Sequence, residues 1–490
     1  MKNDNKLNRK SILSNFIWRY LERCGAQSVT FVVTIVLARI LTPEIYGTVA
    51  LMSVFTVIMQ VFIESGLGNA LIQKKDSDDI DFSTVFYFNI FICVILYFLL
   101  FLLAPVISDY YEMDNLVAPI RVLGLAIIIS GVKNIQQAYV SKTLQFKRFF
   151  FATLGGTIGA GFIGIFMALQ GFGVWALICQ YLFNNLVDTL ILWATVKWRP
   201  RRVFSFKRLK KLVSYGWKIF ASGMISTLYV KARQLIIGKY YSPGDLGYYS
   251  KGNQFPEVIV TNINHSIDSV LFPVMSKSQN DLVRLKAIAR RAITTSCFIM
   301  WPIMFGLMAI AEPLVKIVLT DKWLPCVFYL RIFCLIYSFE PFQTANLNAL
   351  KAIGRSDVYL KIETVKKIIG FAGLIFSCFI SVKAIALAYL LTAFIGMILN
   401  AYPSKKLISY SFREQVKDVL PSLSLAVIMF LVCVVISFLN INSILIVILQ
   451  IVVGAFIYIS LAYLFKFESF VYCLSLVKSY IPSRKSVSKE

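Results

Sequence analysis

The sequence predicts an all-α integral membrane protein, and three observations lead to this prediction. Of its 490 residues, 58% are hydrophobic and only 15% are charged, whereas soluble proteins carry charge on about a quarter of their residues. The mean hydropathy is +0.72. The charged residues gather between apolar stretches of about twenty residues, the length of a helix that crosses a bilayer. This pattern disfavours a soluble protein with many buried helices.

Apolar length, together with the polar, Pro and Gly residues between the stretches, predicts about fourteen spans. They cover residues 11–40, 44–66, 81–107, 115–140, 148–170, 173–196, 206–237, 244–273, 282–310, 324–350, 357–380, 382–402, 416–439 and 442–465. The first ten residues lack the pattern of a cleavable signal, so we expect the first stretch to remain as a spanning helix.

The basic stretch KWRPRRVFSFKRLKK at residues 197–211 contains eight Lys or Arg residues and no acid. Each Lys or Arg at the centre of a spanning helix costs about 2.5–3.5 kcal/mol, so this stretch must be a loop, and its charge places it in the cytoplasm. Lys and Arg are also frequent in loops that follow even-numbered spans, whereas the loop at 108–118 has none. An even number of spans with both termini in the cytoplasm satisfies this alternation.

Two parts of the chain repeat each other. Residues 39–47 (RILTPEIYG) match residues 239–247 (KYYSPGDLG) in the cation, the hydroxyl, the Pro and the Gly, and Arg121 matches Arg331 in a similar register. Six helices per repeat give both halves the same orientation, with an axis along the membrane normal. We therefore predict two pseudo-symmetric six-helix lobes at 1–196 and 212–402, joined by the cytoplasmic junction 197–211. The remaining segment, 403–490, adds two C-terminal helices and a basic cytoplasmic tail.

Polar residues follow one face of four predicted helices, two in each half. These faces consist of Arg19, Arg23, Gln27, Thr30 and Thr34; Ser53, Thr56, Gln60 and Glu64; Lys218, Ser222, Ser226, Tyr229 and Arg233; and Asn253, Glu257, Thr261, Asn264 and Asp268. Spacings of three and four place each set on one side of its helix. Because lipid cannot satisfy polar groups, the pattern predicts one polar cavity at the interface of the halves. The alternative is that polar residues join helices and that Arg near a helix end reaches the headgroups.

Gly131 and Pro341 stand at equivalent positions of the two halves, 210 residues apart and in mid-helix. Helix breakers at matching positions predict a substrate region or a hinge. Lys133 follows Gly131 directly, and Glu340 and Gln343 flank Pro341. The alternative is that Pro and Gly are simply common in spanning helices.

Three segments carry a family resemblance: LARILTPEIYGTVAL, ESGLGNALIQ and KYYSPGDLGYYSKGNQFP. With them the chain resembles the polysaccharide transporters of the multidrug/oligosaccharidyl-lipid/polysaccharide exporter superfamily, and within these the O-antigen and exopolysaccharide flippases of the Wzx or WzxC-like type. The resemblance covers essentially the whole chain. It implies two six-helix lobes plus two helices around a V-shaped cavity in the bacterial inner membrane. It also implies movement of undecaprenyl-diphosphate-linked oligosaccharide to the outer leaflet, for lipopolysaccharide or exopolysaccharide synthesis.

The resemblance and the charge together predict a substrate site. The groups expected to contact diphosphate or acidic sugar are Arg19, Arg23, Lys218 and Arg233, with Lys133 and Arg121 behind them. Those expected to contact the glycan are Gln27, Gln60, Tyr229, Asn253 and Asn264. Glu64, Glu257 and Asp268 could couple transport to H⁺ or Na⁺, or could neutralise the cations. The expected partners are the lipid-linked oligosaccharide, membrane lipids, and the polymerase and chain-length machinery of the same pathway.

Other function classes are less well supported. One His and scattered Cys residues do not indicate a metal site or another cofactor, and the basic character is explained by the membrane rather than by nucleic acid. A membrane glycan polymerase would need a large outer loop with catalytic residues, which the short loops do not provide, so we expect no enzyme. A drug or toxin exporter is disfavoured because the first helix has no Asp. A lipid II flippase stays open as an alternative.

Overall fold

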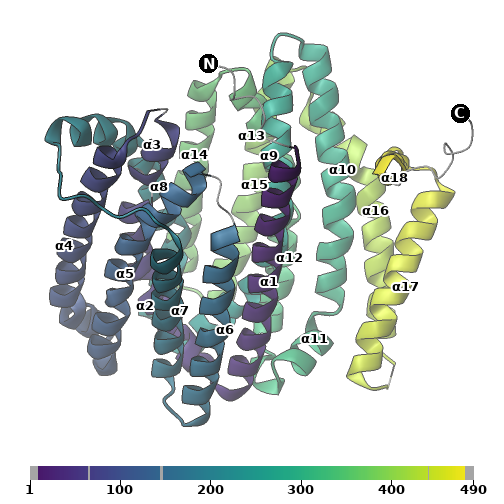
Figure 1. Ribbon diagram of the computed structural model, residues 1–490. Helices are drawn as coiled ribbons and strands as arrows, with labels where there is room; N and C mark the ends of the chain where they lie inside the picture. The colour runs from purple at the N-terminus through teal and green to yellow at the C-terminus, as the bar shows by residue number, and fades with distance from the viewer. Residues whose placement is uncertain (1–8, 65–66, 75, 144–146, 440, 481–490) are drawn as a thin grey trace, which may run out of the picture. The chain divides into compact units, whose positions relative to one another are not determined.

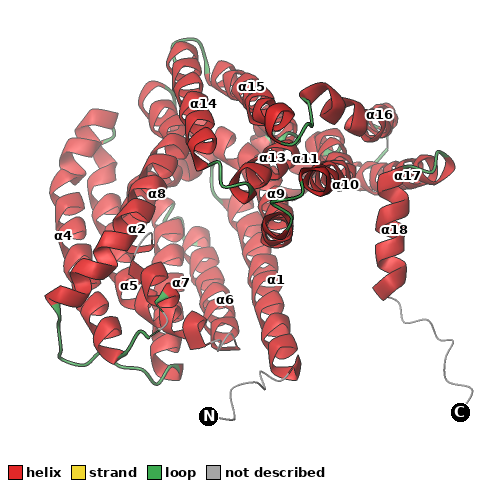
Figure 2. Cartoon of the chain, turned by 90° about the horizontal axis from the view of Figure 1, so that it is seen from above, coloured by secondary structure: helices red, strands yellow, loops and turns green. Residues whose placement is uncertain are grey.

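The computed structural model describes residues 9–64, 67–74, 76–143, 147–439 and 441–480. Over these residues the chain forms helices joined by short loops, and no strand occurs among them (Figure 2). The predicted all-α class is therefore confirmed. Nine described helices are both long and apolar enough to cross a membrane, and the total of about fourteen spans stays a prediction.

The chain divides into two compact units, Met1–Gly247 and Tyr248–Glu490. This division does not coincide with the predicted junction at 197–211. The reason is the packing of α8 (Phe206–Tyr240), which contacts α2, α3 and α4 and so belongs to the first unit. The predicted lobes, as halves of a repeat, stay a prediction.

The first unit contains helices α1 to α8 and the first residues of α9 (Figure 1). They are α1 (Arg9–Ile40), α2 (Pro43–Glu64), α3 (Leu67–Gln73), α4 (Asp79–Tyr111), the 3₁₀ turn η1 (Asp114–Leu116), α5 (Val117–Thr143), α6 (Lys147–Leu169), α7 (Val174–Thr195) and α8. Helix α5 packs between α4 and α7, and α6 packs on both α7 and α1. One buried cluster joins Phe82 and Phe86 of α4 to Ile135 of α5 and to Trp198 beyond α7.

The junction between α7 and α8 is irregular only from Val196 to Ser205. The prediction of a loop over 197–211 is therefore wrong for residues 206–211, which form the start of α8. The irregular part is fixed to α4 and α5. The amide of Arg201 donates to the Ser83 hydroxyl at 2.9 Å, and the Gln136 side chain donates to the Trp198 carbonyl at 3.2 Å. The indole of Trp198 stacks on Tyr139, with ring centroids 6.1 Å apart. A loop that is rich in Lys and Arg is thus held by an aromatic side chain and by backbone hydrogen bonds.

The second unit contains the remaining helices. They are most of α9 (Pro243–Lys277), α10 (Leu282–Ala309), α11 (Ala311–Val318), the 3₁₀ turn η2 (Asp321–Trp323), α12 (Cys326–Tyr337), α13 (Glu340–Ala352), α14 (Ser356–Ser377), α15 (Val382–Leu407), α16 (Phe412–Ile436), α17 (Ser443–Leu464) and α18 (Glu468–Tyr480). Helix α16 packs along α10, and α14 packs along α15. Buried hydrogen bonds from Asn346 of α13 to Gln415 of α16 (2.9 Å) and from Ser404 of α15 to Asn346 (2.6 Å) join three helices.

The two matching turns of the predicted repeat meet in the first unit. Helices α2 and α9 begin at Pro43 and Pro243 and bring Gly47 and Gly247 into close approach. A Cβ atom at Gly47 would lie 1.6 Å from the carbonyl oxygen of Pro243, and one at Gly247 would lie 2.1 Å from that of Pro43. Only glycine permits this crossing, which explains why both copies of the turn carry it.

Candidate functional site

A buried polar cluster links α5 to α7 in the first unit. The ammonium of Lys133 lies 3.1 Å from both the Asp188 carboxylate and the Asn185 amide oxygen. The side chains of Lys133 and Asp188 are only 15% and 13% exposed. A charge this deep in a helical bundle needs a partner, because its desolvation costs several kcal/mol. The cluster is therefore a neutralised pair with an additional hydrogen bond.

The local sequence explains how α7 holds its side of the cluster. Asn185 and Asp188 are three residues apart and share one face of the helix. Gly156 of α6 lets α7 come close, since a Cβ there would lie 2.8 Å from the amide oxygen of Asn184. The sequence pattern predicts Lys133 as a site residue but neither of its partners. The signal was present, because Asn184, Asn185 and Asp188 interrupt an otherwise apolar stretch.

The second unit holds a comparable cluster on other helices. Lys366 of α14 donates to the Glu363 carboxylate at 2.7 Å and to the Gln343 side chain of α13 at 3.2 Å. Asn400 of α15 donates to the same Gln343 oxygen at 3.2 Å. The side chains of Lys366 and Glu363 are 19% and 24% exposed. Among the described residues, each unit thus contains a largely buried Lys–carboxylate pair with amide partners. The sequence pattern does not predict the second pair.

The helix breakers behave differently in the two units. The predicted span 324–350 is divided into α12 and α13 at Ser338 and Phe339, immediately before Pro341. Proline lacks an amide hydrogen and disfavours helix in the preceding residue, which explains the break. The indole of Trp301 donates to the Ser338 carbonyl at 2.9 Å and so satisfies a freed acceptor.

Gly131 does not break its helix, because α5 is continuous from Val117 to Thr143. A Cβ at Gly131 would lie 2.4 Å from the Cys93 sulfur, and the Gly131 carbonyl accepts a hydrogen bond from Asn89 at 3.2 Å. Gly131 therefore serves the close packing of α4 on α5. The prediction of matching helix breaks is correct for Pro341 and wrong for Gly131.

The polar face of α8 includes both open and buried residues. Lys218, Ser222 and Ser226 are exposed. Arg233 is only 4% exposed. Its guanidinium carbon lies 5.1 Å from the ring centroid of Tyr229, and its Nη2 donates to the Tyr229 hydroxyl at 3.3 Å. Arg233 and Tyr229 therefore form a cation–aromatic pair, and Lys218 stands open on the same helix.

The polar face of α9 is connected to α12 and α13. Asn253 donates to the Glu257 carboxylate at 2.8 Å and accepts from the Tyr337 hydroxyl at 3.0 Å. Asp268 accepts from the Asn348 amide. Asn264 is partly buried, and its side-chain oxygen has no hydrogen-bond partner among the residues that the structure describes.

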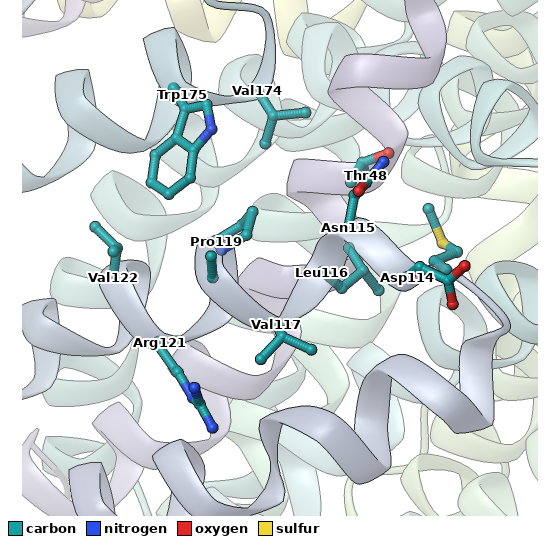
Figure 3. Close-up of a pocket in the computed structure, with 12 residues that line it drawn as sticks. Thr48, Asp114, Asn115, Leu116, Val117, Pro119, Arg121, Val122, Val174 and Trp175 are labelled. Atoms are coloured by element: carbon teal, nitrogen blue, oxygen red, sulfur yellow. The ribbon is translucent and has the colours of Figure 1, made fainter.

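Arg121 lines a different cavity, of about 930 Å³, which also includes Thr48 of α2, Asp114 of η1 and Trp175 of α7 (Figure 3). Its guanidinium carbon lies 4.0 Å from the Phe101 ring centroid, and its Nε donates to the Phe101 carbonyl at 3.3 Å. Twelve residues separate Arg121 from Lys133, about 18 Å along a helix. The structure therefore does not bring these two predicted cations together.

The remaining predicted residues lie on α1 and α2. Gln60 donates to the Tyr181 hydroxyl at 2.8 Å, and Gln27 is partly exposed. The side chains of Arg19, Arg23 and Glu64 lie outside the part of the chain that the structure describes. The convergence of all these residues on one cavity stays a prediction.

Comparison with known proteins gives the family. The profile of the family described as polysaccharide biosynthesis protein matches residues 36–328. The chain is 25% identical over 318 residues to the succinoglycan biosynthesis transport protein ExoT of Rhizobium meliloti, covering 65% of this chain and 64% of the relative. It is 25% identical to the teichuronic acid biosynthesis protein TuaB of Bacillus subtilis (62% and 63% covered). It is 22% identical to the lipopolysaccharide biosynthesis protein WzxC of Escherichia coli (83% and 84%). The match thus spans slightly under two thirds of the first two relatives.

Two solved structures share the fold. A lipid II flippase, MurJ, in an inward closed conformation aligns with a TM-score of 0.74 at 16% identity, covering 92% of this chain and 98% of its own. An inward-facing multidrug resistance transporter of the MATE family aligns with a TM-score of 0.60 at 14% identity, covering 79% and 96%. At these identities the likeness concerns the fold alone. The family profile covers more than half of the chain, and we conclude that the protein belongs to the polysaccharide biosynthesis protein family.

Proposed function

We propose that the chain is a flippase for an oligosaccharide linked to undecaprenyl diphosphate. It would move this substrate from the inner to the outer leaflet of a bacterial inner membrane, with both of its termini in the cytoplasm. A polymerase and chain-length machinery would then extend the glycan into a cell-surface polysaccharide. The family and the polysaccharide-related names of ExoT, TuaB and WzxC support this proposal. The process is transport, and no covalent step is proposed.

One observation carries the proposal: polar side chains stand exposed in the middle of very long helices. Helices α8 and α9 each have 35 residues, about 52 Å at 1.5 Å per residue, which is longer than the hydrocarbon core. Ser226 lies 20 residues into α8, and Glu257 lies 14 residues into α9, and both are exposed. A carboxylate such as Glu257 is costly among acyl chains at this depth, and a polar helix face is expected to turn toward protein or water. Ser226 and Glu257 would line a water-filled path.

The charge of α8 suits a diphosphate. Lys218 is exposed and could approach the phosphates, and Arg233 could reach them by exchanging its contact with Tyr229. Arg offers paired donors that match phosphate oxygens, and both cations would offset the desolvation of a diphosphate. Arg19 and Arg23 belong to the same proposed set. The prenyl chain could stay in lipid while the headgroup crosses.

The paired lysines have a different proposed role. Lys133 and Lys366 already contact Asp188 and Glu363, so binding a phosphate would first require breaking a buried pair, which costs about 3–5 kcal/mol. We assign both lysines to holding neighbouring helices in register. Gln27, Gln60, Tyr229, Asn253 and Asn264 are the proposed glycan contacts, since their amides and hydroxyl match sugar hydroxyls.

Ion coupling is proposed for the acids of α9. Glu257 is exposed and is bonded by Asn253, and Asp268 is exposed and is bonded by Asn348. Carboxylates with amide partners can take up H⁺ or bind Na⁺, and Glu64 could act with them. Transport that depends on a pH or Na⁺ gradient in the wild type, and that loses this dependence in Glu257→Gln, would support the assignment.

The test of the proposed function uses a strain that lacks the gene. Polyprenyl-diphosphate glycans are extracted and identified by mass spectrometry, and their leaflet is determined with a membrane-impermeant glycan-modifying reagent. We expect a completed repeat unit to accumulate on the cytoplasmic side. A normal pool with altered sensitivity to cationic drugs would contradict the proposal and favour a drug exporter. Accumulated lipid II would favour the peptidoglycan precursor as substrate.

A further inference from the structure

A cavity of about 800 Å³ lies at the end of the first unit where α3 and the start of α8 meet. It is separate from the polar helix faces described above. Its lining includes Lys74, Lys207, Arg208 and Lys211, together with Asp76 and Asp78. Four cationic side chains thus face two carboxylates, which leaves the wall net positive.

Two of the four cations, Lys74 and Arg208, already form ion pairs. Arg208 contacts Asp78 at 2.5 Å and the fully buried Asp81 at 3.4 Å, and Lys74 contacts Asp81 at 2.5 Å. These contacts pair two of the cations with two acids. These ion pairs connect the end of α3 and the start of α4 to the start of α8 beside the cavity.

Lys207 and Lys211 stand outside this network. Both are exposed, and neither has an ion pair or hydrogen bond with any residue in the described ranges. Four residues apart, they share one face of α8. Asp76 lines the same cavity as the opposing charge. Two adjacent ammonium groups on a cavity wall can hold one phosphate between them.

Exposed aromatic residues directly precede these lysines in the sequence. Phe204 and Phe206 are 40% and 79% exposed, and their rings contact each other edge to face with centroids 4.8 Å apart. Such a pair is costly in water but favourable at a membrane interface, where aromatic rings insert among the acyl chains. The end of the junction and the start of α8 thus combine two exposed aromatic rings with the two lysines that form no ion pair within the described ranges. Lipid-binding segments show the same combination of apolar and basic residues.

We infer that this cavity binds the phosphate of an anionic phospholipid from the cytoplasmic leaflet. Lys207 and Lys211 hold the phosphate, and Phe204 and Phe206 lie among the acyl chains. The cytoplasmic assignment follows from the positive-inside rule applied to the junction. The inference goes beyond the proposed function, because the ligand is a resident membrane lipid rather than the transported molecule. Bound lipid would fix the first turn of α8 to α3 and stabilise the first unit.

The experiment uses the purified full chain in detergent and measures binding of phosphatidylglycerol by native mass spectrometry. Lys207→Gln/Lys211→Gln is the test variant. Arg202→Gln/Lys210→Gln is the matched control, because it removes the same charge from exposed residues of the same segment that do not line the cavity. The test variant should bind about thirtyfold more weakly, because both phosphate contacts are lost, and the control should bind nearly as the wild type does.

Two further measurements distinguish a lipid phosphate from a soluble phosphate and test whether the aromatic rings contribute to lipid binding. Soluble glycerol phosphate should bind far more weakly than the lipid, and Phe206→Ser should weaken binding of the lipid but not of glycerol phosphate. Equal loss in the test and control variants would overturn the inference, since it would indicate diffuse attraction. Equal binding of lipid and glycerol phosphate would also overturn it, in favour of a site for a soluble phosphate. All substituted residues are exposed, and thermal unfolding without lipid checks that each variant is folded.

Discussion

Gly47 and Gly247 meet at the starts of α2 and α9, where a Cβ on Gly47 would lie 1.6 Å from the Pro243 carbonyl oxygen. The reciprocal Cβ on Gly247 would lie 2.1 Å from the Pro43 carbonyl oxygen. The two turns match in sequence at an offset of 200 residues. Backbone therefore packs directly on backbone where the repeated turns cross, and small residues make such a close crossing possible.

Replacing either glycine with alanine should destabilise the protein. Backbone carbonyls cannot move aside as a flexible side chain can, so Gly47→Ala and Gly247→Ala should each cost at least about 1–3 kcal/mol. Thermal unfolding of the purified protein in detergent measures the effect. Gly25→Ala is the control, because its Cβ would meet only the end of Leu154 at 3.7 Å and alanine favours helix. A Gly47→Ala protein as stable as the control would contradict the described crossing.

Lys133 and Asp188 should behave as one unit. Lys133→Met and Asp188→Leu each leave one buried charge without its partner, so each should lose about 3–5 kcal/mol, whereas the double variant should recover most of this loss. Unfolding in detergent gives the double-mutant cycle. Transport gives the second readout: a stable double variant that still exports polysaccharide agrees with a supporting role. A stable double variant without export would instead make Lys133 a substrate contact.

The break between α12 and α13 should matter for transport more than for folding. Pro341→Ala supplies the missing amide hydrogen and permits one continuous helix. We expect unchanged or higher stability and reduced polysaccharide export, because a continuous helix is more rigid than two helices joined at a break. Pro421→Ala is the comparison, since α16 runs unbroken through Pro421. Normal export by Pro341→Ala would show that the break is only a packing feature.

The ion pair between Asp78 and Arg208 should depend on pH only under acidic conditions. The hydrogen bond from Arg208 lowers the pKa of Asp78 from 3.8 to about 2. Because the folded pKa lies below the unfolded one, the contact stabilises the fold above about pH 4 and is lost as the pH falls towards 2. Asp78 is exposed, so the contribution is small and should weaken further with added salt.

Hydrogen exchange at the amides of Arg201 and Ser205, corrected for intrinsic rates, measures this effect. These amides bond to Ser83 and Thr84. Their protection should be constant between pH 5 and 8 and should fall below pH 4. In Arg208→Gln, protection should already be reduced at pH 7. Protection that changes between pH 6 and 8 would show that another group controls the junction.

The positions of the long helices could be predicted from the sequence, but the side-chain contacts between helices could not. Each predicted span coincides with one described helix, except 324–350, which contains both α12 and α13. Apolar length decides whether a helix can cross a bilayer, and length can be read from one sequence. The helices α3, α11 and α18 were not predicted, because they have 7, 8 and 13 residues and are too short to span.

Partners depend on the register between helices, which periodicity does not contain. Lys133 pairs with a residue 55 positions away, and nothing in either segment fixes the height at which α5 meets α7. The same limit explains Gly131. A glycine in mid-helix either breaks the helix or permits close packing, and here the sulfur of Cys93 occupies the space where a side chain would stand. Periodicity predicts which residues share a polar helix face, and packing against neighbouring helices decides which of them are exposed.

Translocation by the purified chain in proteoliposomes tests the proposed flippase activity most directly. The vesicles carry a polyprenyl-diphosphate oligosaccharide labelled with a fluorophore that an impermeant reductant destroys only in the outer leaflet. We expect that active protein exposes the inner-leaflet half of the label, and that Lys218→Gln slows this exposure while Lys218→Arg retains it. A rate equal to that of protein-free vesicles, with folded protein and an imposed ion gradient, would contradict the proposed flippase activity.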